Sequence, residues 1–435
     1  MKKYALEKEK ALIMIFNSSE REIFVYIVLP EETDFITAGR FVLENHPQGP
    51  YGRFVYAKSY LENPNAVEID PIELKLTKNT YNTFQHEGIF GALRDAGPDY
   101  WGRYVIEKQS GRALLNEIDY LLESPDDRAG ALGFGLTVKP PLSSHRFNKV
   151  MDLKKLIEVS ETLIQDNNVD SIGNSRTNRI KNLLLIGTSM GGARPKTVVE
   201  DQNGLWLAKF NRFDDRWNVA RVEYAMLKLA QYVGINTSEH RLESIGGQDV
   251  LLVKRFDRKK KEKDYTRARM VSALSILRAD DTFENRAKWS YILLADEIRR
   301  FSQNPKKDLK ELFLRICFNA LISNLDDHPR NHAFISEKKN WVLSPAYDLT
   351  PSPVLAKDRR DLAMICGNYG RFANAKNILT QHGRFLLTQE EAITLVTDMT
   401  QKIERIWHEI THRSGVHLSD IELIRPAFVY PGFFT

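Results

Sequence analysis

Three oxygen-bearing side chains in the C-terminal half of the chain have the types and spacing that phosphoryl transfer requires. That reaction uses a carboxylate to accept the proton of the attacking hydroxyl and oxygen donors to hold Mg²⁺. Kinases carry the base and an Asn as D-x-x-x-x-N, and a metal-binding Asp follows a hairpin. Asp326 and Asn331 have this spacing, and Asp348 follows a hairpin expected at 333–335 and 341–343. The pattern predicts Asp326 as the base and Asn331 and Asp348 as magnesium ligands.

The same loop allows other interpretations, because Asp, Asn and Pro also form ordinary turns. Asp327 is a rival base, although its separation from Asn331 is one residue too short. His328 and His332 have the i, i+4 spacing of a zinc pair on a helix, but Pro329 between them disfavours the helix. We therefore expect His328 to brace the loop.

A lysine and a glutamate upstream could complete a site for ATP. Lys209 lies in a strand expected at 205–210, and Glu223 lies on a helix expected at 219–233. Glu223 falls within the apolar face of that helix by its 3.6-residue period. Since a carboxylate on an apolar face requires a buried partner, the pattern favours a pair with Lys209. The alternative is that Glu223 lies at the margin of this apolar face and points to solvent.

A stretch of small residues precedes this strand, and such a loop lets backbone N–H groups approach phosphate. It contains Thr188, Ser189, Met190, Gly191, Gly192 and Ala193. It lacks G-x-G-x-x-G, and Lys196-Thr197 follows Pro195 where a Walker motif has glycine. On its own, the stretch indicates only a tight turn.

The elements that must position these residues divide the chain into three units. A mixed α/β unit is expected at 1–145, a strand-rich unit at 146–258 and a helical unit at 259–435. The length of 435 residues and the 42% hydrophobic content provide material for a large core. The finer expectations are strands at 11–16, 23–29 and 250–256, a hairpin around 201–204, and helices near 90–109, 119–124, 153–165, 308–323 and 388–412.

Details within these elements can also be predicted. The polar stretch 167–179 is expected to be a loop. The helix at 308–323 is expected to open with a capping box from Asp308 to Glu311, and the helix at 388–412 with one from Thr388 to Glu391. Ile393 is expected on the apolar stripe of the last helix, together with Val396, Ile403, Ile406 and Ile410.

Charge and cysteine content restrict the setting. The formal charge of +5 is local, because residues 251–269 contain nine Lys or Arg and three Asp or Glu, a net of +6. The run 258–263 could attract nucleic acid or another acidic partner, although a solvated loop is the simpler interpretation. Two cysteines and the absence of a long apolar run predict a reduced, cytoplasmic protein that does not enter a membrane.

Taken together, these motifs resemble the HipA family of serine/threonine kinase toxins. The similar segments are Ser189–Thr197, Trp206–Lys209, Val253–Arg258, Asp326–Asn331, Ser344–Leu349, Ile89–Asp99 and Asp126–Leu132. The chain differs at Arg194-Pro195, where the family often has Gln-Glu, and at Lys254, where an acidic residue is common.

The resemblance implies an α+β, protein-kinase-like fold of two lobes with an extra N-terminal α/β subdomain. It implies that Asp326 is the catalytic base, that Asn331 and Asp348 bind Mg²⁺, and that Lys209 holds the phosphates of ATP beside Glu223. His328 and the small-residue loop 188–193 would contact the nucleotide as well. The strand that contains Val253, Lys254 and Phe256 would be the hinge over adenine.

The resemblance further implies autophosphorylation at Ser189, with Thr188 as the adjacent alternative, which would silence the kinase. The implied partners are a protein substrate, an aminoacyl-tRNA synthetase being the best-known family target, and a HipB-like helix-turn-helix antitoxin that contacts operator DNA.

Two other functions stay open. D-x-H-x-x-N also resembles the catalytic loop of lipid kinases, so a lipid or small-molecule kinase is one. An inactive pseudokinase that acts as a DNA-bound corepressor is the other, and the basic run is its main support.

Overall fold

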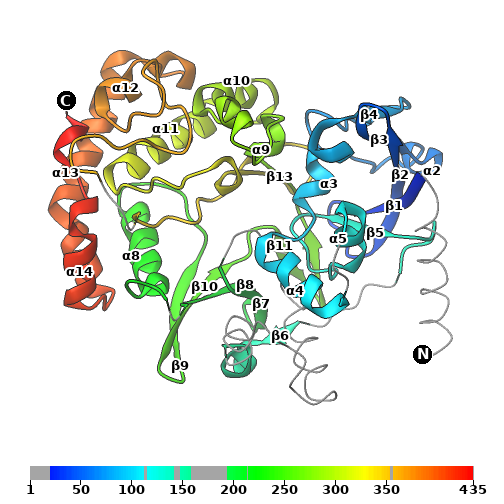
Figure 1. The fold of residues 1–435 in the computed structure, drawn as a ribbon, viewed down its shortest axis with the longest axis horizontal. Helices are drawn as coiled ribbons and strands as arrows, with labels where there is room; N and C mark the ends of the chain where they lie inside the picture. The colour runs from blue at the N-terminus through cyan, green and yellow to red at the C-terminus, as the bar shows by residue number, and fades with distance from the viewer. Residues whose placement is uncertain are drawn as a thin grey trace.

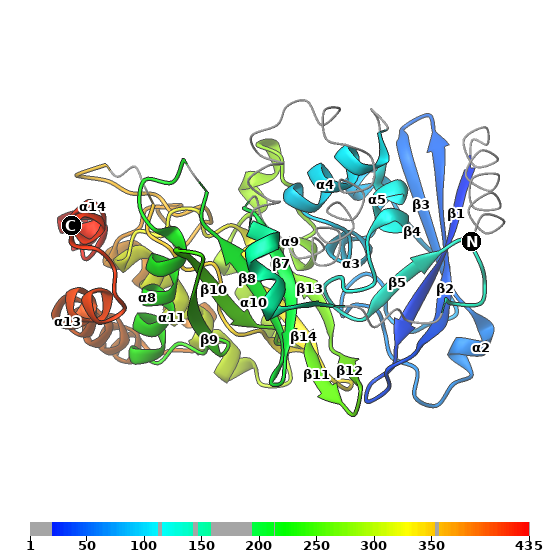
Figure 2. The ribbon, with the colours of Figure 1, turned by 90° about the horizontal axis from the view of Figure 1, so that it is seen from below.

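The structure is a computed structural model that describes residues 20–111, 115–141, 147–157, 194–212, 214–352 and 356–434. Two five-stranded sheets and a group of helices follow one another along the long axis of the molecule (Figures 1 and 2). The predicted strand at 11–16, the loop at 167–179 and the small-residue loop at 188–193 lie outside the described residues. So does the end of the helix predicted at 153–165.

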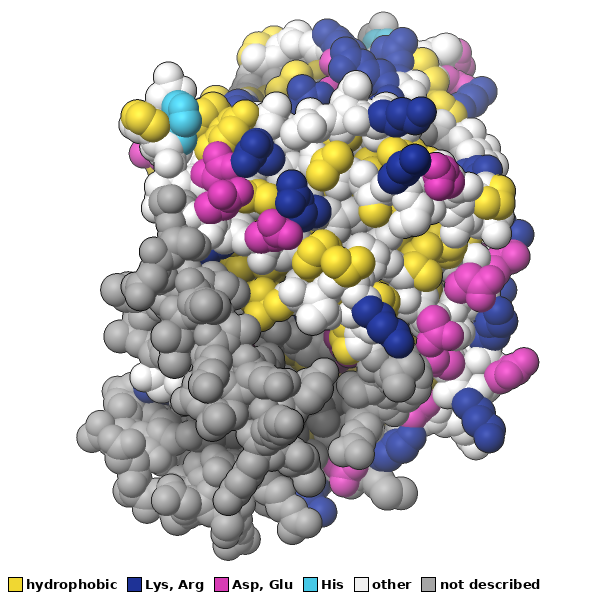
Figure 3. Space-filling model, turned by 90° about the vertical axis from the view of Figure 1, so that its right-hand side faces the viewer, with side chains coloured by type: hydrophobic (Ala, Val, Ile, Leu, Met, Phe, Trp, Pro, Cys, Tyr) yellow, Lys and Arg dark blue, Asp and Glu magenta, His cyan; other side chains and the backbone are white. Residues whose placement is uncertain are grey.

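The first sheet is antiparallel in the order β4-β3-β2-β1-β5. Its strands are β1 (Glu20–Val28), β2 (Phe35–His46), β3 (Gly49–Tyr56), β4 (Tyr81–Thr83) and β5 (Leu132–Gly135). Its helices are α2 (Lys58–Leu61), α3 (Gly91–Asp95), α4 (Tyr100–Ser110) and α5 (Glu117–Glu123). Basic, acidic and hydrophobic side chains intermingle on the described part of its outer face (Figure 3).

Helix α3 joins this N-terminal subdomain to the rest of the molecule, since it packs against β13 (Arg269–Ser272) and α9 (Ala273–Ile276). The approach is close enough that a Cβ on Gly91 would lie 2.6 Å from the Cβ of Ser275. Only glycine fits at this position, so its backbone sets how near the two units can come.

The second sheet has the order β6-β7-β8-β10-β9, in which only the β6–β7 pairing is parallel. Its strands are β6 (Asn148–Lys149), β7 (Lys196–Asp201), β8 (Gly204–Phe210), β9 (His240–Ile245) and β10 (Gln248–Lys254). The predicted hairpin at 201–204 is present, and Gly204 takes φ +130° in its turn. Helix α8 (Val219–Tyr232) packs on β10 and begins at Asn218, whose side chain accepts from the N–H of Arg221.

The helical part contains α10 (Tyr291–Phe301), α11 (Pro305–Leu321), α12 (Ala375–Leu379), α13 (Gln389–Arg413) and α14 (Leu418–Ile424). The hairpin predicted before Asp348 is β14 (Ala333–Ser336) with β15 (Val342–Leu343), and β13 pairs with β14. A strand-rich lobe with one helix and a helical lobe, beside the N-terminal subdomain, form the two-lobe kinase-like fold that the sequence predicts. Within the described ranges, no helix has the length and apolar character that crossing a bilayer requires.

Two predicted details of the helices are wrong and one is confirmed. Helix α11 begins three residues before Asp308, because Pro305 is well suited to a first helical position. Asp308 accepts hydrogen bonds from Ser302 and from the N–H of Leu343 instead of capping the helix. Ile393 is 43% exposed and lies off the buried stripe. The capping box of Thr388 and Glu391 is present.

A buried charged cluster follows β10 and links the second sheet to the N-terminal subdomain. Asp257 accepts from Arg255, from Arg258 at 2.8 Å and from the N–H of Gly130 at 2.9 Å. Both arginines also donate to the carbonyl of Arg128. Burial opposes the charge on Asp257, but the two arginines outweigh it and hold the pKa of Asp257 below its ordinary value.

The predicted basic run at 258–263 is shorter in the structure, because its first residue belongs to this buried cluster. Arg258 is buried and paired, whereas residues 259–263 are exposed on the hairpin of β11 (Arg258–Lys261) and β12 (Asp264–Arg267). The solvated positive charge therefore begins at Lys259.

Replacing Asp257 with Asn should leave two buried guanidinium groups with one neutral partner. We expect the free energy of unfolding to fall by about 3 kcal/mol, measured by urea denaturation followed by circular dichroism. The matched control is Asp361→Asn, which removes an exposed carboxylate paired with Arg359. It should change stability by less than about 0.5 kcal/mol. Equal effects of the two substitutions would contradict a stabilising role for the cluster.

Candidate active site

A cavity of about 510 Å³ opens where the N-terminal subdomain, the second sheet and the helical lobe meet. Many predicted site residues line it, from three different parts of the chain. They are Lys209, Val253, Lys254, Phe256, His328, Asn331 and Asp348. Glu223 and Asp326 are not part of the wall. Glu223 lies behind Lys209, and Asp326 lies on the solvent side of the loop that carries His328 and Asn331.

A buried lysine joins two carboxylates at the centre of the site. The Lys209 ammonium on β8 donates to Glu223 Oε1 of α8 at 2.6 Å and to the Asp348 carboxylate after β15. Burial disfavours the charge on Lys209, but Asp348 and Glu223 outweigh it and raise the pKa of Lys209 above its ordinary value. Lys209 therefore stays protonated, and its position is fixed from both lobes.

Glu223 and Asp348 respond differently to the shared lysine. Burial dominates at Glu223 and raises its pKa despite the neighbouring ammonium. At Asp348 burial acts in the same direction, but Lys209 and Lys196 outweigh it and lower the pKa of Asp348 to about 2. Asp348 is thus an ionised carboxylate at neutral pH.

The backbone at Asp348 is held in an uncommon conformation. Its φ is +56°, in the left-handed region that non-glycine residues seldom occupy. The side-chain amide of Asn324 donates to the carbonyl of Asp348 at 3.3 Å. The preceding Tyr347 stacks on Phe256 with ring centroids 5.9 Å apart and donates to the carbonyl of Arg330 at 2.7 Å. These contacts aim the carboxylate at Lys209 and into the cavity.

The predicted catalytic loop is a tight turn that organises Asp326 and Asn331. The carbonyl of Asp326 accepts from the N–H of His328 at 2.8 Å and from the Asn331 amide at 3.3 Å. Asn331 donates with its nitrogen in this bond, so its side-chain oxygen is not used there. The His328 ring packs edge-on against Trp289 at 6.5 Å, which supports the predicted bracing role.

The side chain of Asp326 is exposed, and its electrostatic surroundings suit a proton acceptor. Partial loss of hydration raises the pKa of Asp326 most; His328 opposes the rise, and Asp348 and Asp327 add to it. A carboxylate with a raised pKa is a stronger base than an ordinary aspartate.

The rival base, Asp327, is committed to the interior. It is 1% exposed and accepts from the buried Tyr291 hydroxyl and from His332 Nε2 at 2.7 Å. Burial would raise the pKa of Asp327, but His332 and Tyr291 outweigh it and lower the pKa. A weakly basic carboxylate without solvent access cannot receive a substrate proton. His332 is held in this pair and forms no zinc site with His328.

Sequence reasoning missed one buried pair at the site. Lys196 at the start of β7 donates to Asp99 of the N-terminal subdomain at 3.3 Å, and both side chains are buried. Burial raises the pKa of Asp99 to about 6, although Lys196 opposes the rise. Asp99 also caps α4 by accepting from Gly102. Around Lys196 the sequence indicates only a small-residue loop that ends in Lys-Thr, and nothing local indicates a partner so distant in sequence.

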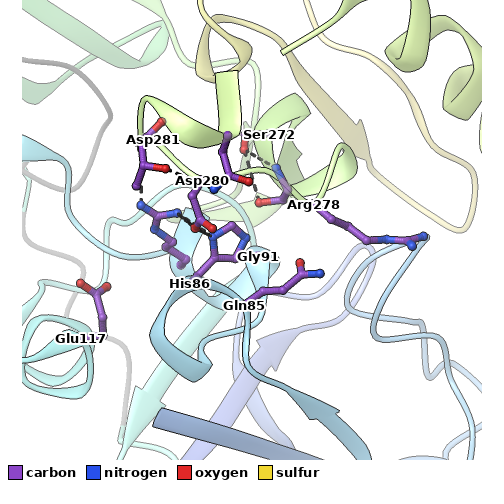
Figure 4. A network of polar contacts seen from close by, with 12 residues as sticks. Gln85, His86, Gly91, Glu117, Ser272, Arg278, Asp280 and Asp281 are labelled. Atoms are coloured by element: carbon purple, nitrogen blue, oxygen red, sulfur yellow. Dashed lines mark hydrogen bonds and ion pairs between the residues drawn. The ribbon is translucent and has the colours of Figure 1, made fainter. Parts of the chain in front are cut away.

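The N-terminal subdomain also takes part in holding the predicted catalytic loop. Arg330, between His328 and Asn331, donates to Asp281 at 2.8 Å, and Asp281 accepts from Arg94 of α3 at 3.4 Å. Figure 4 shows Asp280 and Asp281 of the helical lobe facing the subdomain, where His86 contacts Asp280. Asp95, at the end of α3, accepts from Ser272. The loop is therefore fixed by charges from a separate unit.

Asn331 and Asp348 form a donor set that fits magnesium. Both offer oxygen, the ligand that a hard cation prefers. Within the described ranges, no group of three or more His, Cys, Asp or Glu side chains could hold a metal. A cation here would need further oxygens, as Mg²⁺ obtains from phosphates and water in phosphotransferases.

The predicted hinge residues contact the same cavity from the second sheet. Val253 and Lys254 end β10. Leu207 of the neighbouring strand β8 pairs with Val253 and lines the cavity beside it. The ammonium of Lys254 donates to Glu239 at 2.7 Å. Thr188, Ser189, Met190, Gly191, Gly192 and Ala193 lie outside the described residues, so their predicted contact with phosphate stays a prediction.

The two adjacent aspartates of the loop should respond differently to neutralisation. Asp327→Asn removes a buried, paired charge, so the free energy of unfolding should fall by about 3 kcal/mol. Asp326→Asn removes an exposed carboxylate that lies near those of Asp327 and Asp348. It should change the free energy of unfolding by less than about 0.5 kcal/mol. Urea unfolding of both variants measures the difference. If Asp326→Asn is the more destabilising, the assignment of the buried and exposed carboxylates is wrong.

Comparison with known proteins agrees with this architecture. The chain is similar to HipA of Shewanella oneidensis MR-1, solved with HipB and its operator DNA. The TM-score is 0.67 at 14% identity, over 93% of this chain and 94% of that one. A Haemophilus influenzae protein that is named only as a candidate kinase is 26% identical over 221 residues, 46% of this chain and 64% of the relative. The chain thus matches less than two thirds of the length of that relative.

Family descriptions match both halves of the molecule. Residues 36–135 match the HipA N-terminal domain, and residues 188–407 match the HipA-like C-terminal domain. The first region contains most of the N-terminal sheet, and the second contains Lys209, Glu223, Asp326, Asn331 and Asp348. Since the C-terminal match alone spans just over half of the 435 residues, the chain belongs to the HipA family.

Proposed function

We propose that this protein is a serine/threonine-protein kinase, the toxin of a toxin–antitoxin pair, which transfers the γ-phosphate of ATP to a protein hydroxyl. One observation carries the proposal. Lys209, Glu223 and Asp348 form a fixed charge triad at a cavity that Asn331 also lines, and the exposed Asp326 lies on the adjoining loop. A nucleotide in the cavity and a protein outside it would meet at that loop.

Each residue has a role in this reaction. Lys209 binds the α- and β-phosphates, and Glu223 keeps its ammonium in place. Asp348 and Asn331 would hold Mg²⁺, which neutralises charge on the phosphates when it is bound. The acceptor oxygen bonds to the γ-phosphorus as the bond to the β–γ bridging oxygen breaks. Asp326 takes the proton that the hydroxyl releases.

The surroundings of the cavity suit a nucleotide. Lys196 adds a second buried cation within electrostatic reach of Asp348. Leu207, Val253 and Phe256 add an apolar area to the lining of the cavity, which suits an adenine ring.

Family membership supports the partners in this proposal. HipA of Shewanella oneidensis was solved with HipB and operator DNA. We infer that a HipB-like helix-turn-helix antitoxin binds this chain and contacts operator DNA, and that the phosphorylated protein could be an aminoacyl-tRNA synthetase.

A second function is favoured by the exposed lysines of the β11–β12 hairpin, Lys259, Lys260, Lys261 and Lys263. These could contact DNA if the chain acted as an inactive corepressor. The intact triad argues against that function, because an inactive protein has no need to hold three charged groups together at an open cavity. A lipid kinase would instead phosphorylate phosphoinositide vesicles and leave proteins unlabelled.

Asp326→Asn should lower phosphate transfer at least about 100-fold because the proton acceptor is lost. The affinity for ATP should stay unchanged, since Asp326 lies outside the cavity wall. Transfer is measured with γ-³²P-ATP and Mg²⁺, and nucleotide binding by calorimetry. In cells, the wild-type chain should arrest growth and the variant should not. Phosphate transfer at the wild-type rate by Asp326→Asn would refute the role of Asp326 as the base. Normal growth of cells that contain active wild-type enzyme would refute the role of the chain as a toxin.

Ser189 should become phosphorylated when the purified chain is incubated with ATP and Mg²⁺, because the matching loop serine is the autophosphorylation site that the family resemblance implies. A phosphoserine carries nearly two negative charges and would compete with ATP for the cationic site. Mass spectrometry of the loop peptide measures the modification. Ser189→Ala should prolong activity, and Thr188→Ala is the matched control. An unmodified Ser189 in an active enzyme would contradict this assignment.

A further inference from the structure

An exposed aromatic ring and a neighbouring arginine lie beside the catalytic loop, outside the cavity. Phe283 is 80% exposed, the highest exposed fraction among the large hydrophobic residues described. Arg286 stands one helical turn later in the 3-10 turn Glu284–Lys288, and its guanidinium lies over Phe283 at 5.8 Å and over Trp289 at 5.4 Å.

Trp289 attaches this surface to the catalytic loop. Its ring is buried and packs edge-on against His328, and its indole N–H donates to the carbonyl of Asp280 at 3.1 Å. The positions of Phe283 and Arg286 are therefore defined relative to Asp326, which stands two residues before His328.

Arg286 differs in its contacts from the other charged residues of the stretch 280–288. Asp280 and Asp281 are engaged by Arg94, and Lys288 donates to a backbone carbonyl. Glu284 is hydrogen-bonded to Thr282. Arg286, in contrast, contacts two aromatic rings, and no carboxylate of the described residues lies within ion-pair distance of it. A guanidinium that contacts only the faces of aromatic rings keeps its N–H groups for another partner.

This surface lies beside the path that a substrate hydroxyl would take to Asp326. A hydroxyl that reaches Asp326 must approach from the solvent side, where Arg286 is near enough to act electrostatically on Asp326. Exposed aromatic residues and arginines are the types that contribute most to protein recognition.

We propose that Phe283 and Arg286 form a docking surface for the protein substrate, selecting a segment with an apolar side chain and a carboxylate close to the acceptor serine or threonine. The inference rests on the proposed kinase function and adds a sequence preference to it. Charge complementarity identifies the carboxylate, because Arg286 has no ion-pair partner among the residues that the structure describes. The Phe283 ring provides the apolar contact.

A charge reversal tests the proposal directly. Full-length wild type and Arg286→Glu are incubated with γ-³²P-ATP and a positional-scanning peptide library that has a central serine or threonine. The wild type should select Asp or Glu at one position near the acceptor. The variant should select Lys or Arg at the same position, a reversal that a merely structural role could not produce.

Phe283→Ala should lower the selection of aromatic and aliphatic side chains at least about fivefold and leave the acidic preference intact. Arg300→Glu is the matched control, since it makes the same charge change at an exposed residue at the end of α10. The KM for ATP should be the same in all variants.

Two results would overturn the docking surface: an active wild type without acidic preference, and an Arg286→Glu variant that keeps the wild-type preference. A wild-type chain that transfers phosphate neither to itself nor to any peptide would refute the proposed function instead.

Discussion

The site depends on the protonated Lys209, which lies between Glu223 and Asp348. The three residues come from three separate elements. A buried ammonium is stable only when nearby carboxylates compensate for its lost hydration. β8, α8 and the turn after β15 must therefore keep fixed positions relative to one another. The left-handed backbone at Asp348 and the bond from Asn324 are further parts of the same constraint. A single ion triad thus joins the strand-rich lobe to the helical lobe.

The N-terminal subdomain is part of this arrangement. Asp99 pairs with Lys196 beside the cavity, and the Arg94–Asp281–Arg330 chain of ion pairs links the subdomain to the predicted catalytic loop. The cluster at Asp257 connects the subdomain to the end of β10 in the same manner. The charges at Asp257 and at the Lys196–Asp99 pair are buried and tolerate little displacement, so these two links fix the N-terminal subdomain against the second sheet.

Much of this could be predicted from the sequence, because it follows from local patterns. The spacing of Asp326 and Asn331, the hairpin before Asp348 and the inward-facing Glu223 each depend on neighbours within a few residues. The start of α11 was missed because Pro305 and Asp308 both mark a helix start. Arg258 was placed at the surface because the sequence shows a charge run but not that Arg258 is buried in a pair with the preceding Asp257. The Lys196–Asp99 pair joins residues far apart in sequence, and without other sequences no local pattern could reveal it.

The close approach at Gly91 has a consequence for biosynthesis. Helix α3 packs against β13 and α9, which leave the ribosome long after it. Until then the face of α3 that receives Ser275 is bare, and Asp95 lacks the serines that hydrogen-bond to it. The N-terminal subdomain therefore completes its packing only when β13 and α9 have emerged. The site forms later still, because it also needs Asp348 of the helical lobe.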